Sequence, residues 1–444
     1  MTSLRTAPNP SAIATPAEEA APEERAGRVS WAEAVGLVAV LALAAALRIG
    51  WPGVHTWSYD EARVALLALE TARGGDIAAV GIQSSAGLPN LPAAVWLYAL
   101  PLAISPDPLV ASLWTGAVNV LAIAGLWWLV RRSAGPWAGL TAAALWAGAP
   151  FGAFYSRAIW SQDLLGPLAV AWALLGMRAA QAERREDRIG SVALAAHVFV
   201  AGLAPQVHFA GAALLLPTLW LLVRRRWWRR PRPLVAGAAL AAAAALPYVV
   251  ALWRADALRG TLQAALSGAG GEAGAPRELV GLQRLLEMGV GRGWEWFLLG
   301  GEWQWAEGWT MALTAASVGA GILLLLGAAA LARRLWRARG RTSGPLDALL
   351  LAWLLGAPLL FLGHLTPAYH QYQLAALPAL FALGGYGAVL LPRRRFWRPA
   401  ALAVALGVAA VQGAAFGRGL GIVAERLTPG GIGTPLAYPR AAVR

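Results

Sequence analysis

Long apolar runs alternate with short polar segments along most of the 444-residue chain. A helix that crosses a bilayer needs about 20 apolar residues, and about eleven runs approach that length. They cover residues 31–50, 108–130, 136–154, 162–179, 191–205, 207–223, 234–253, 309–332, 346–364, 371–391 and 398–416. Only Pro205 and Gln206 separate two of these runs, which predicts short or broken helices at a tight outer turn. The pattern predicts an all-α polytopic membrane protein.

Composition agrees with this prediction, because 58% of the residues are hydrophobic and only 14% are charged. No soluble globular protein could cover that much apolar surface. The net charge of +14 comes from arginines that occur in short bursts between apolar runs. Such bursts indicate topology, so no nucleic-acid partner is expected. The absence of cysteine excludes disulfides and thiolate metal sites.

The arginine clusters test the predicted spans independently, because cytoplasmic loops retain basic residues. They lie at residues 25–28, 131–132, 178–188, 224–232, 333–341 and 393–398. All fall on one side of the membrane if the segment 88–105 does not cross it. Three prolines, Pro89, Pro92 and Pro101, interrupt that segment. We therefore expect a juxtamembrane or re-entrant helix within a long outer loop, residues 51–107.

Three regions follow from this topology. Residues 1–30 lack the basic start and cleavage site of a signal peptide and are expected to form a disordered cytoplasmic tail. Residues 31–416 form one transmembrane domain, whose largest outer loops are 51–107 and 254–308. Residues 417–444 form a short tail on the outer side. The reactive polar residues are then expected at the outer face, with the N-terminus in the cytoplasm.

The first outer loop carries two adjacent acids, Asp60 and Glu61. Ser58 and Glu61 have the spacing of a capping box, Asp60 favours the positive end of a helix dipole, and Gly74 ends the short helix. A second interpretation is that partial burial at the membrane surface raises the pKa of Asp60 toward that of a general base. Both interpretations can hold together.

Further candidates lie at other outer helix ends. Asp163 starts a span, should face the bundle interior, and has Arg157 as its nearest candidate partner. A local ion pair or helix cap is the alternative for this acid. Hydrogen-bond donors that suit an anionic group come from His208, Tyr369, His370 and Tyr372. Solvated histidines and an aromatic belt would give the same pattern. In loop 254–308, an amphipathic stretch at about residues 276–288 precedes five tryptophans between residues 294 and 309, which favours anchoring over sugar stacking.

Four short segments carry a resemblance to a known family. They are Asp60-Glu61-Ala62-Arg63, Leu88 to Tyr98, Ser156-Arg157 to Leu165, and Tyr372 to Pro378. Together with the arginine-ended spans, they resemble the polyprenyl-phosphate-sugar-dependent glycosyltransferases of the protein O-mannosyltransferase and aminoarabinose-transferase superfamily. The resemblance covers most of residues 31–400. It implies a GT-C-like bundle of about 11 transmembrane helices with juxtamembrane helices in the first outer loop.

The resemblance also implies a reaction. Asp60 would be the catalytic base in an inverting transfer from a polyprenyl-phosphate-linked sugar to an acceptor hydroxyl or amine. The substrate-binding residues would be Glu61, Arg63, Arg157, Asp163, His208, Tyr369, His370 and Tyr372. Asn90 and Leu91 depart from the family's paired prolines, and His370-Gln371 stands where an Arg or Lys often binds the lipid phosphate. Arg157, then Arg63, then His208 are the alternative phosphate ligands.

The expected partners are the lipid-linked donor, a lipid, glycan or protein acceptor, and the lipids of a bacterial cytoplasmic membrane. No cofactor is expected, and one acidic pair near histidines leaves metal dependence open. A transporter or flippase for a lipid-linked glycan and a non-catalytic assembly protein are the rival hypotheses. Polarity at the outer helix ends, rather than at the bilayer midplane, favours surface chemistry over transport. The sequence has no P-loop, so ATP-driven transport is unsupported.

Overall fold

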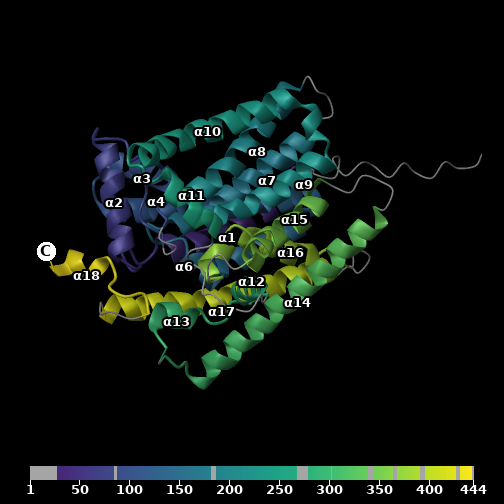
Figure 1. Ribbon diagram of the computed structural model, residues 1–444. Helices are drawn as coiled ribbons and strands as arrows, with labels where there is room; N and C mark the ends of the chain where they lie inside the picture. The colour runs from purple at the N-terminus through teal and green to yellow at the C-terminus, as the bar shows by residue number, and fades with distance from the viewer. Residues whose placement is uncertain are drawn as a thin grey trace, which may run out of the picture.

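The computed structural model describes residues 28–84, 88–181, 187–267, 279–301, 303–338, 345–363, 368–390, 396–426 and 431–442. The regular secondary structure in these ranges is helical, and they contain no strand beyond two isolated β-bridges (Figure 1). The fold class predicted from the apolar pattern is therefore confirmed. Residues 1–27 of the expected N-terminal tail lie outside the described ranges.

Each predicted span has a helical counterpart. The counterparts are α1 (Trp31–Ile49), α4 (Pro108–Ala134), α5 (Pro136–Gly148) with α6 (Pro150–Phe154), η1 (Ser161–Leu164) with α7 (Leu165–Gln181), α8 (Arg188–Val207), η2 (Phe209–Leu214) with α9 (Leu215–Arg224), α10 (Pro231–Arg254), α14 (Glu307–Arg337), α15 (Pro345–Leu360) with η4 (Phe361–Gly363), α16 (Leu377–Gly387) and α17 (Trp397–Arg426). Within the described ranges, 7 helices are long and apolar enough to cross a membrane: α1, α4, η1 with α7, α8, α10, α14 and α17.

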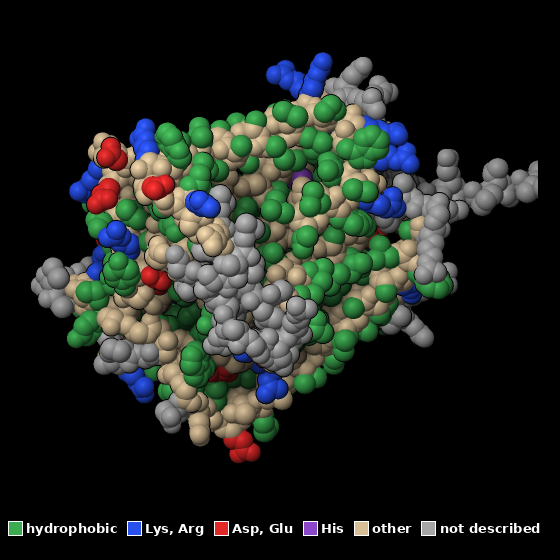
Figure 2. Space-filling view, in the orientation of Figure 1, with side chains coloured by type: hydrophobic (Ala, Val, Ile, Leu, Met, Phe, Trp, Pro, Cys, Tyr) green, Lys and Arg blue, Asp and Glu red, His purple; other side chains and the backbone are tan. Residues whose placement is uncertain are grey.

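Many hydrophobic side chains lie on the face of the bundle that Figure 2 shows. Large examples point outward from α10 and α14, including Val235 at 65% exposure and Leu325 at 73%. A soluble protein rarely exposes a continuous apolar surface of this kind, whereas lipid chains solvate it at no cost. The molecule is therefore a multi-pass membrane protein.

The break between the fifth and sixth predicted spans lies at His208, three residues after Pro205. Pro205 stays inside α8, and the backbone becomes extended at His208 before η2 begins. The Gln206 side chain fixes this corner, since its amide nitrogen donates to the carbonyls of Gly202 at 2.9 Å and of Ala241 in α10 at 2.8 Å. The predicted turn is present at His208, but only the helices after it are short, because α8 has 20 residues whereas η2 and α9 have 6 and 10.

The proline-interrupted segment of the first loop forms a short helix. It is α3 (Ala93–Ile104), which packs against α2 (Tyr59–Ala72) and α4. Its 12 residues span about 18 Å, too little to cross a hydrocarbon core of about 30 Å. Val64, Ala68 and Tyr98 belong to a small apolar core between α2 and α3, separate from the main core. The loop thus contains the short helices that the sequence predicts.

The remaining elements are small. They are η3 (Trp227–Arg229), α11 (Leu258–Ser267), α12 (Val280–Val290), α13 (Trp294–Leu299), η5 (His370–Gln373) and α18 (Ala437–Ala442). In Figure 1, α2, α3 and α18 lie at the left end of the bundle, and α14 runs from beside α13 to the opposite end. Helix α5 lies at the centre, where it packs against α1, α4, α16 and α17.

Candidate active site

Helix α2 places its two N-terminal acids in opposite surroundings. The Glu61 side chain is fully buried, and its Oε2 accepts a hydrogen bond from the Ser58 backbone N–H at 2.9 Å and another from the Ser58 hydroxyl. This capping box is the one expected from the sequence, and Gly74 follows the helix with φ +79°. Asp60 is exposed and has no hydrogen-bond or ion-pair partner among the described residues, and the same holds for Arg63.

The short helix η1, which follows the turn after α6, contains Asp163. This side chain is 1% exposed, and its Oδ2 accepts a hydrogen bond from the Ala158 backbone N–H at 3.2 Å. Its Oδ1 has no partner among the described residues. Glu61 lies close enough for the charges of the two carboxylates to interact. The second acid of the sequence pattern therefore lies beside the first loop, as part of a buried acidic pair.

Arg157 binds the C-terminal end of α1 and does not pair with Asp163. Its guanidinium is buried and donates to four backbone carbonyls, those of Leu47 at 2.6 Å, Gly50 at 2.7 Å, Trp51 at 2.9 Å and Val54 at 3.3 Å. Burial lowers the pKa of Arg157 to about 9, so the group stays charged at pH 7. The ion pair expected with Asp163 is not formed within the described ranges. The positive charge instead caps the C-terminal end of α1.

Sequence reasoning missed His55, which lies in the loop before α2. Its Nδ1 donates to the Thr56 carbonyl at 2.8 Å, and burial lowers the pKa of the ring to about 4. His55, Arg157 and Asp163 line one small cavity of about 10 Å³, which has room for a single water. The only signal in the sequence was a histidine close to the Asp60-Glu61 pair.

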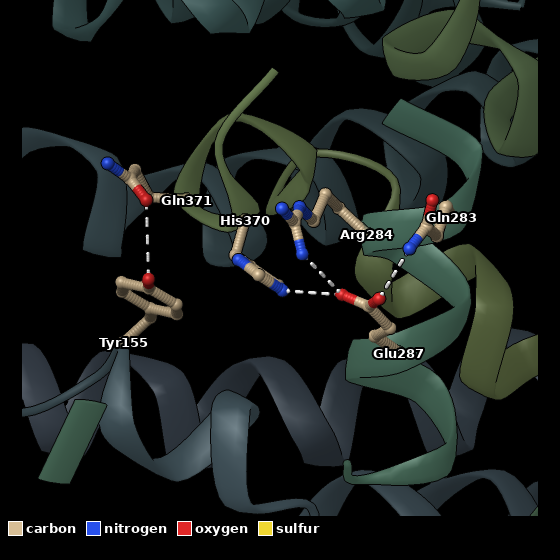
Figure 3. A network of polar contacts seen from close by, with 6 residues as sticks. All are labelled: Tyr155, Gln283, Arg284, Glu287, His370 and Gln371. Carbon is tan, nitrogen blue, oxygen red and sulfur yellow. Dashed lines mark hydrogen bonds and ion pairs between the residues drawn. The ribbon is translucent and has the colours of Figure 1, made fainter. Parts of the chain in front are cut away.

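A second polar network joins η5 to α12 (Figure 3). His370 Nε2 lies 2.9 Å from Glu287 Oε2, Arg284 donates to the same oxygen at 3.0 Å, and Gln283 donates to Glu287 Oε1 at 2.9 Å. Partial burial alone would raise the pKa of Glu287, but these three hydrogen bonds together lower it. Burial also lowers the pKa of His370. Arg284 and Glu287 were not singled out from the sequence, which predicted only an amphipathic stretch there.

The other candidates lie around η5. The rings of His208 and Tyr372 stack at 5.4 Å, and Tyr369 meets Tyr372 edge-on at 5.6 Å. The Ala210 N–H donates to His208 Nδ1 at 3.1 Å, so the proton of the neutral ring lies on Nε2. Burial lowers the pKa of His208 to about 4. The ring is therefore neutral at physiological pH.

Contacts between these segments connect most of the sequence candidates. Element η1, which holds Asp163, packs against η5, and the Tyr155 hydroxyl donates to Gln371 Oε1 at 3.3 Å (Figure 3). The acidic pair, His208 and the His370 network thus form one connected region. Arg63 stays on the exposed face of α2, outside it. The described residues hold no group of three His, Cys, Asp or Glu side chains arranged for a metal ion.

Comparison with known proteins identifies the fold. Residues 89–253 match the family model of dolichyl-phosphate-mannose-protein mannosyltransferase. The ArnT structure from Cupriavidus metallidurans bound to undecaprenyl phosphate aligns with a TM-score of 0.56 and 14% identity, covering 88% of this chain and 77% of that one. The Archaeoglobus fulgidus oligosaccharyltransferase, solved in complex with Zn and sulfate, aligns with a TM-score of 0.51 and 16% identity, covering 86% of this chain and 53% of that one. Among curated proteins, no sequence matches.

These likenesses show that the chain has the fold of the GT-C membrane glycosyltransferases. The resemblance inferred from the four short segments is confirmed at this level. The match to the mannosyltransferase family model covers α3 through α10, which includes the turn with Arg157 and Asp163.

Proposed function

We propose that this protein transfers a sugar from a polyprenyl-phosphate donor to an acceptor hydroxyl or amine at the outer face of the cytoplasmic membrane. The fold is shared with ArnT, whose structure holds undecaprenyl phosphate. The observation that carries the proposal is the contrast at the start of α2. Glu61 and Asp163 are buried, whereas the adjacent Asp60 is exposed and unpaired among the described residues. Asp60 is the carboxylate that an acceptor can reach.

In the proposed reaction, Asp60 removes the proton of the acceptor hydroxyl. The acceptor oxygen then attacks the anomeric carbon from the face opposite the phosphate, and the bond between that carbon and the phosphate oxygen breaks with inversion. A phosphate leaving group needs no strong general acid, so one base and a cationic partner for the departing charge suffice. Glu61 is held by Ser58 and keeps Asp60 at the first turn of α2.

Arg284 is a better candidate than Arg157 or His208 for the cation at the departing phosphate. Four carbonyls already occupy Arg157, and His208 is neutral at pH 7. Arg284 lies beside His370, at the position where the sequence lacks the family's basic residue. Residues of α12 and its flanks line an open cavity of about 470 Å³, among them Leu279, Leu282 and Leu286 as well as Glu287 and Arg292. The apolar part of this lining suits a lipid chain, and Arg292 supplies a cation at the cavity itself.

The test compares Asp60→Asn with Glu70→Gln, which removes another exposed carboxylate of the same helix. Both proteins are reconstituted in nanodiscs with a panel of undecaprenyl-phosphate-linked sugars, and release of undecaprenyl phosphate is followed with membrane lipids and cell-surface glycans as acceptors. Loss of a general base costs about 10²- to 10⁴-fold in rate, so Asp60→Asn should lose transfer while Glu70→Gln retains it. An unchanged rate in Asp60→Asn would remove this residue from the mechanism. Translocation of the lipid-linked sugar across vesicles without transfer would instead support a transporter.

A further inference from the structure

The last described residues of the chain fold back onto the loop that leads to α2. This C-terminal strap, residues 431–442, forms an antiparallel bridge in which Thr56 lies opposite Pro435. Around the bridge, the Trp57 N–H donates to the Thr434 carbonyl at 3.0 Å, and the Leu436 N–H donates to the His55 carbonyl at 3.2 Å. In Figure 1, α18 lies at the same end of the molecule as α2.

The strap is anchored on both sides of this bridge. At its start, a Cβ at Gly431 would lie 2.5 Å from the Trp296 carbonyl oxygen, so the strap passes in close contact with α13. At its end, Arg440 forms an ion pair with Asp107, whose Oδ1 also accepts a hydrogen bond from the Leu109 N–H and so caps α4. Three elements of the bundle therefore fix the position of the strap.

The strap also closes the cavity behind the acidic pair. Ile432 is 5% exposed and lines the small cavity together with His55, Arg157 and Asp163. Leu436 is 2% exposed. Gly53, with φ +79°, permits the close approach, because its Cβ position lies 3.1 Å from the Ala437 nitrogen, which donates to the Gly53 carbonyl at 2.9 Å. Without the strap, these backbone groups and one wall of the cavity would be exposed.

We propose that the C-terminal strap is a positioning segment for Asp60 and stays closed during turnover. The bridge fixes residues 53–57, and the next residue, Ser58, is the N-cap of the helix whose second residue is Asp60. A shift of about 1 Å in a reacting group can cost about 10²-fold in rate, so the register of this loop matters to a base at its end. The strap itself touches no reacting atom. The inference rests on the proposed function.

The absence of cysteine from the sequence permits a direct test with an engineered disulfide. Thr56 and Pro435 occupy the non-hydrogen-bonded position of the bridge, where Cα atoms lie about 4.5 Å apart, within the range that a disulfide spans. The variant Thr56→Cys/Pro435→Cys should form a disulfide on mild oxidation and keep the transfer rate of its reduced form. The single variants Thr56→Cys and Pro435→Cys are the controls. Loss of transfer on oxidation that is recovered with reductant would show that the strap has to open, and would overturn the proposal.

A second experiment removes the strap. Deletion of residues 431–444 should lower kcat about 10²-fold with little change in the donor KM, and a synthetic peptide of residues 431–444 should restore part of the rate. Ile432→Ala and Arg440→Gln keep the full chain and should also lower kcat. Arg440→Lys keeps the positive charge and should have the kcat of the wild type. A full rate in the deletion variant, in Ile432→Ala and in Arg440→Gln would overturn the positioning role. Disulfide formation is read by mass and does not require activity, so a chain that cross-links but never transfers a sugar contradicts the proposed function rather than the placement of the strap.

Discussion

Asp60 and Glu61 are consecutive residues of α2, and the helix itself separates them. Neighbours in an α-helix point about 100° apart, so when Glu61 turns inward to Ser58 and Asp163, Asp60 remains on the exposed side. The acid that caps the helix is therefore not the acid that we propose as the base. The buried acid stabilises the start of the helix, and the exposed acid remains accessible.

At the residue scale, His208 gives a test of pH dependence. Its folded pKa of about 4 lies below the usual 6.5, so between these values the unfolded chain binds more protons than the folded one. The stability that the neutral ring contributes is therefore present above pH 6.5 and is lost as the pH falls toward 4. We expect wild type and His208→Gln to show the same shape of transfer rate against pH from 5.5 to 8.

The measurement is the transfer rate of the two proteins at fixed donor concentration across that range, with thermal stability recorded at each pH. A cationic phosphate ligand would behave differently. If His208 bound phosphate as a cation, the wild-type rate would rise as the pH fell below 6.5 and the rise would be absent from His208→Gln. That result would support His208 as a phosphate ligand, the role for which it was the third candidate after Arg157 and Arg63.

At the element scale, small residues set the distances between helices. Gly327 of α14 faces α16, where a Cβ would lie 1.8 Å from the Leu383 carbonyl oxygen. Gly148 of α5 faces α17, with its Cβ position 2.3 Å from the Ala409 Cα. Close backbone approach of this kind is how membrane helices gain packing energy in the absence of a hydrophobic driving force.

Gly327→Ala should therefore lower stability although alanine is the better helix former. The added methyl group has to push α16 away, and overpacking costs about 1–3 kcal/mol. Gly407→Ala in α17 is the matched control, because nothing lies within 4 Å of its Cβ position. It should be neutral or slightly stabilising. The measurement is the melting temperature of each variant in the same detergent. Equal melting temperatures for Gly327→Ala and Gly407→Ala would contradict the tight α14–α16 contact.

The elements also show how far the sequence could predict the fold. Lengths of apolar runs are local properties, and each predicted run contains a helix in the structure. The ends of helices depend on contacts that the sequence does not display. The last span was predicted to end at residue 416, yet α17 continues to Arg426, where Leu298 and Trp294 of α13 pack over Gly419. The ring of Trp294 also meets Phe416 at 5.4 Å.

At the scale of the whole molecule, the candidate site is assembled from segments that lie far apart in the chain. Topology could predict that Asp60, Asp163, His208 and His370 share one end of the bundle. It could not predict the partners, because an amphipathic pattern such as that of α12 does not show which element its polar face will meet. The contact of Glu287 with His370 and the closure of the His55 cavity by Ile432 depend on tertiary packing, which only the folded chain reveals.

Orientation in the membrane is the remaining property of the whole molecule, and the cysteine-free sequence makes it measurable. Ile77, which is 69% exposed, follows α2, and Trp228, which is 54% exposed, lies in η3 beside the arginines that precede α10. Basic clusters resist translocation, so η3 should lie in the cytoplasm and the α2 end outside. A membrane-impermeant maleimide should then label Ile77→Cys in cells with a permeabilised outer membrane and label Trp228→Cys only after lysis. The reverse pattern would place Asp60 in the cytoplasm, where an acceptor at the outer surface could not reach it, and the proposed reaction would have to be assigned to the inner face.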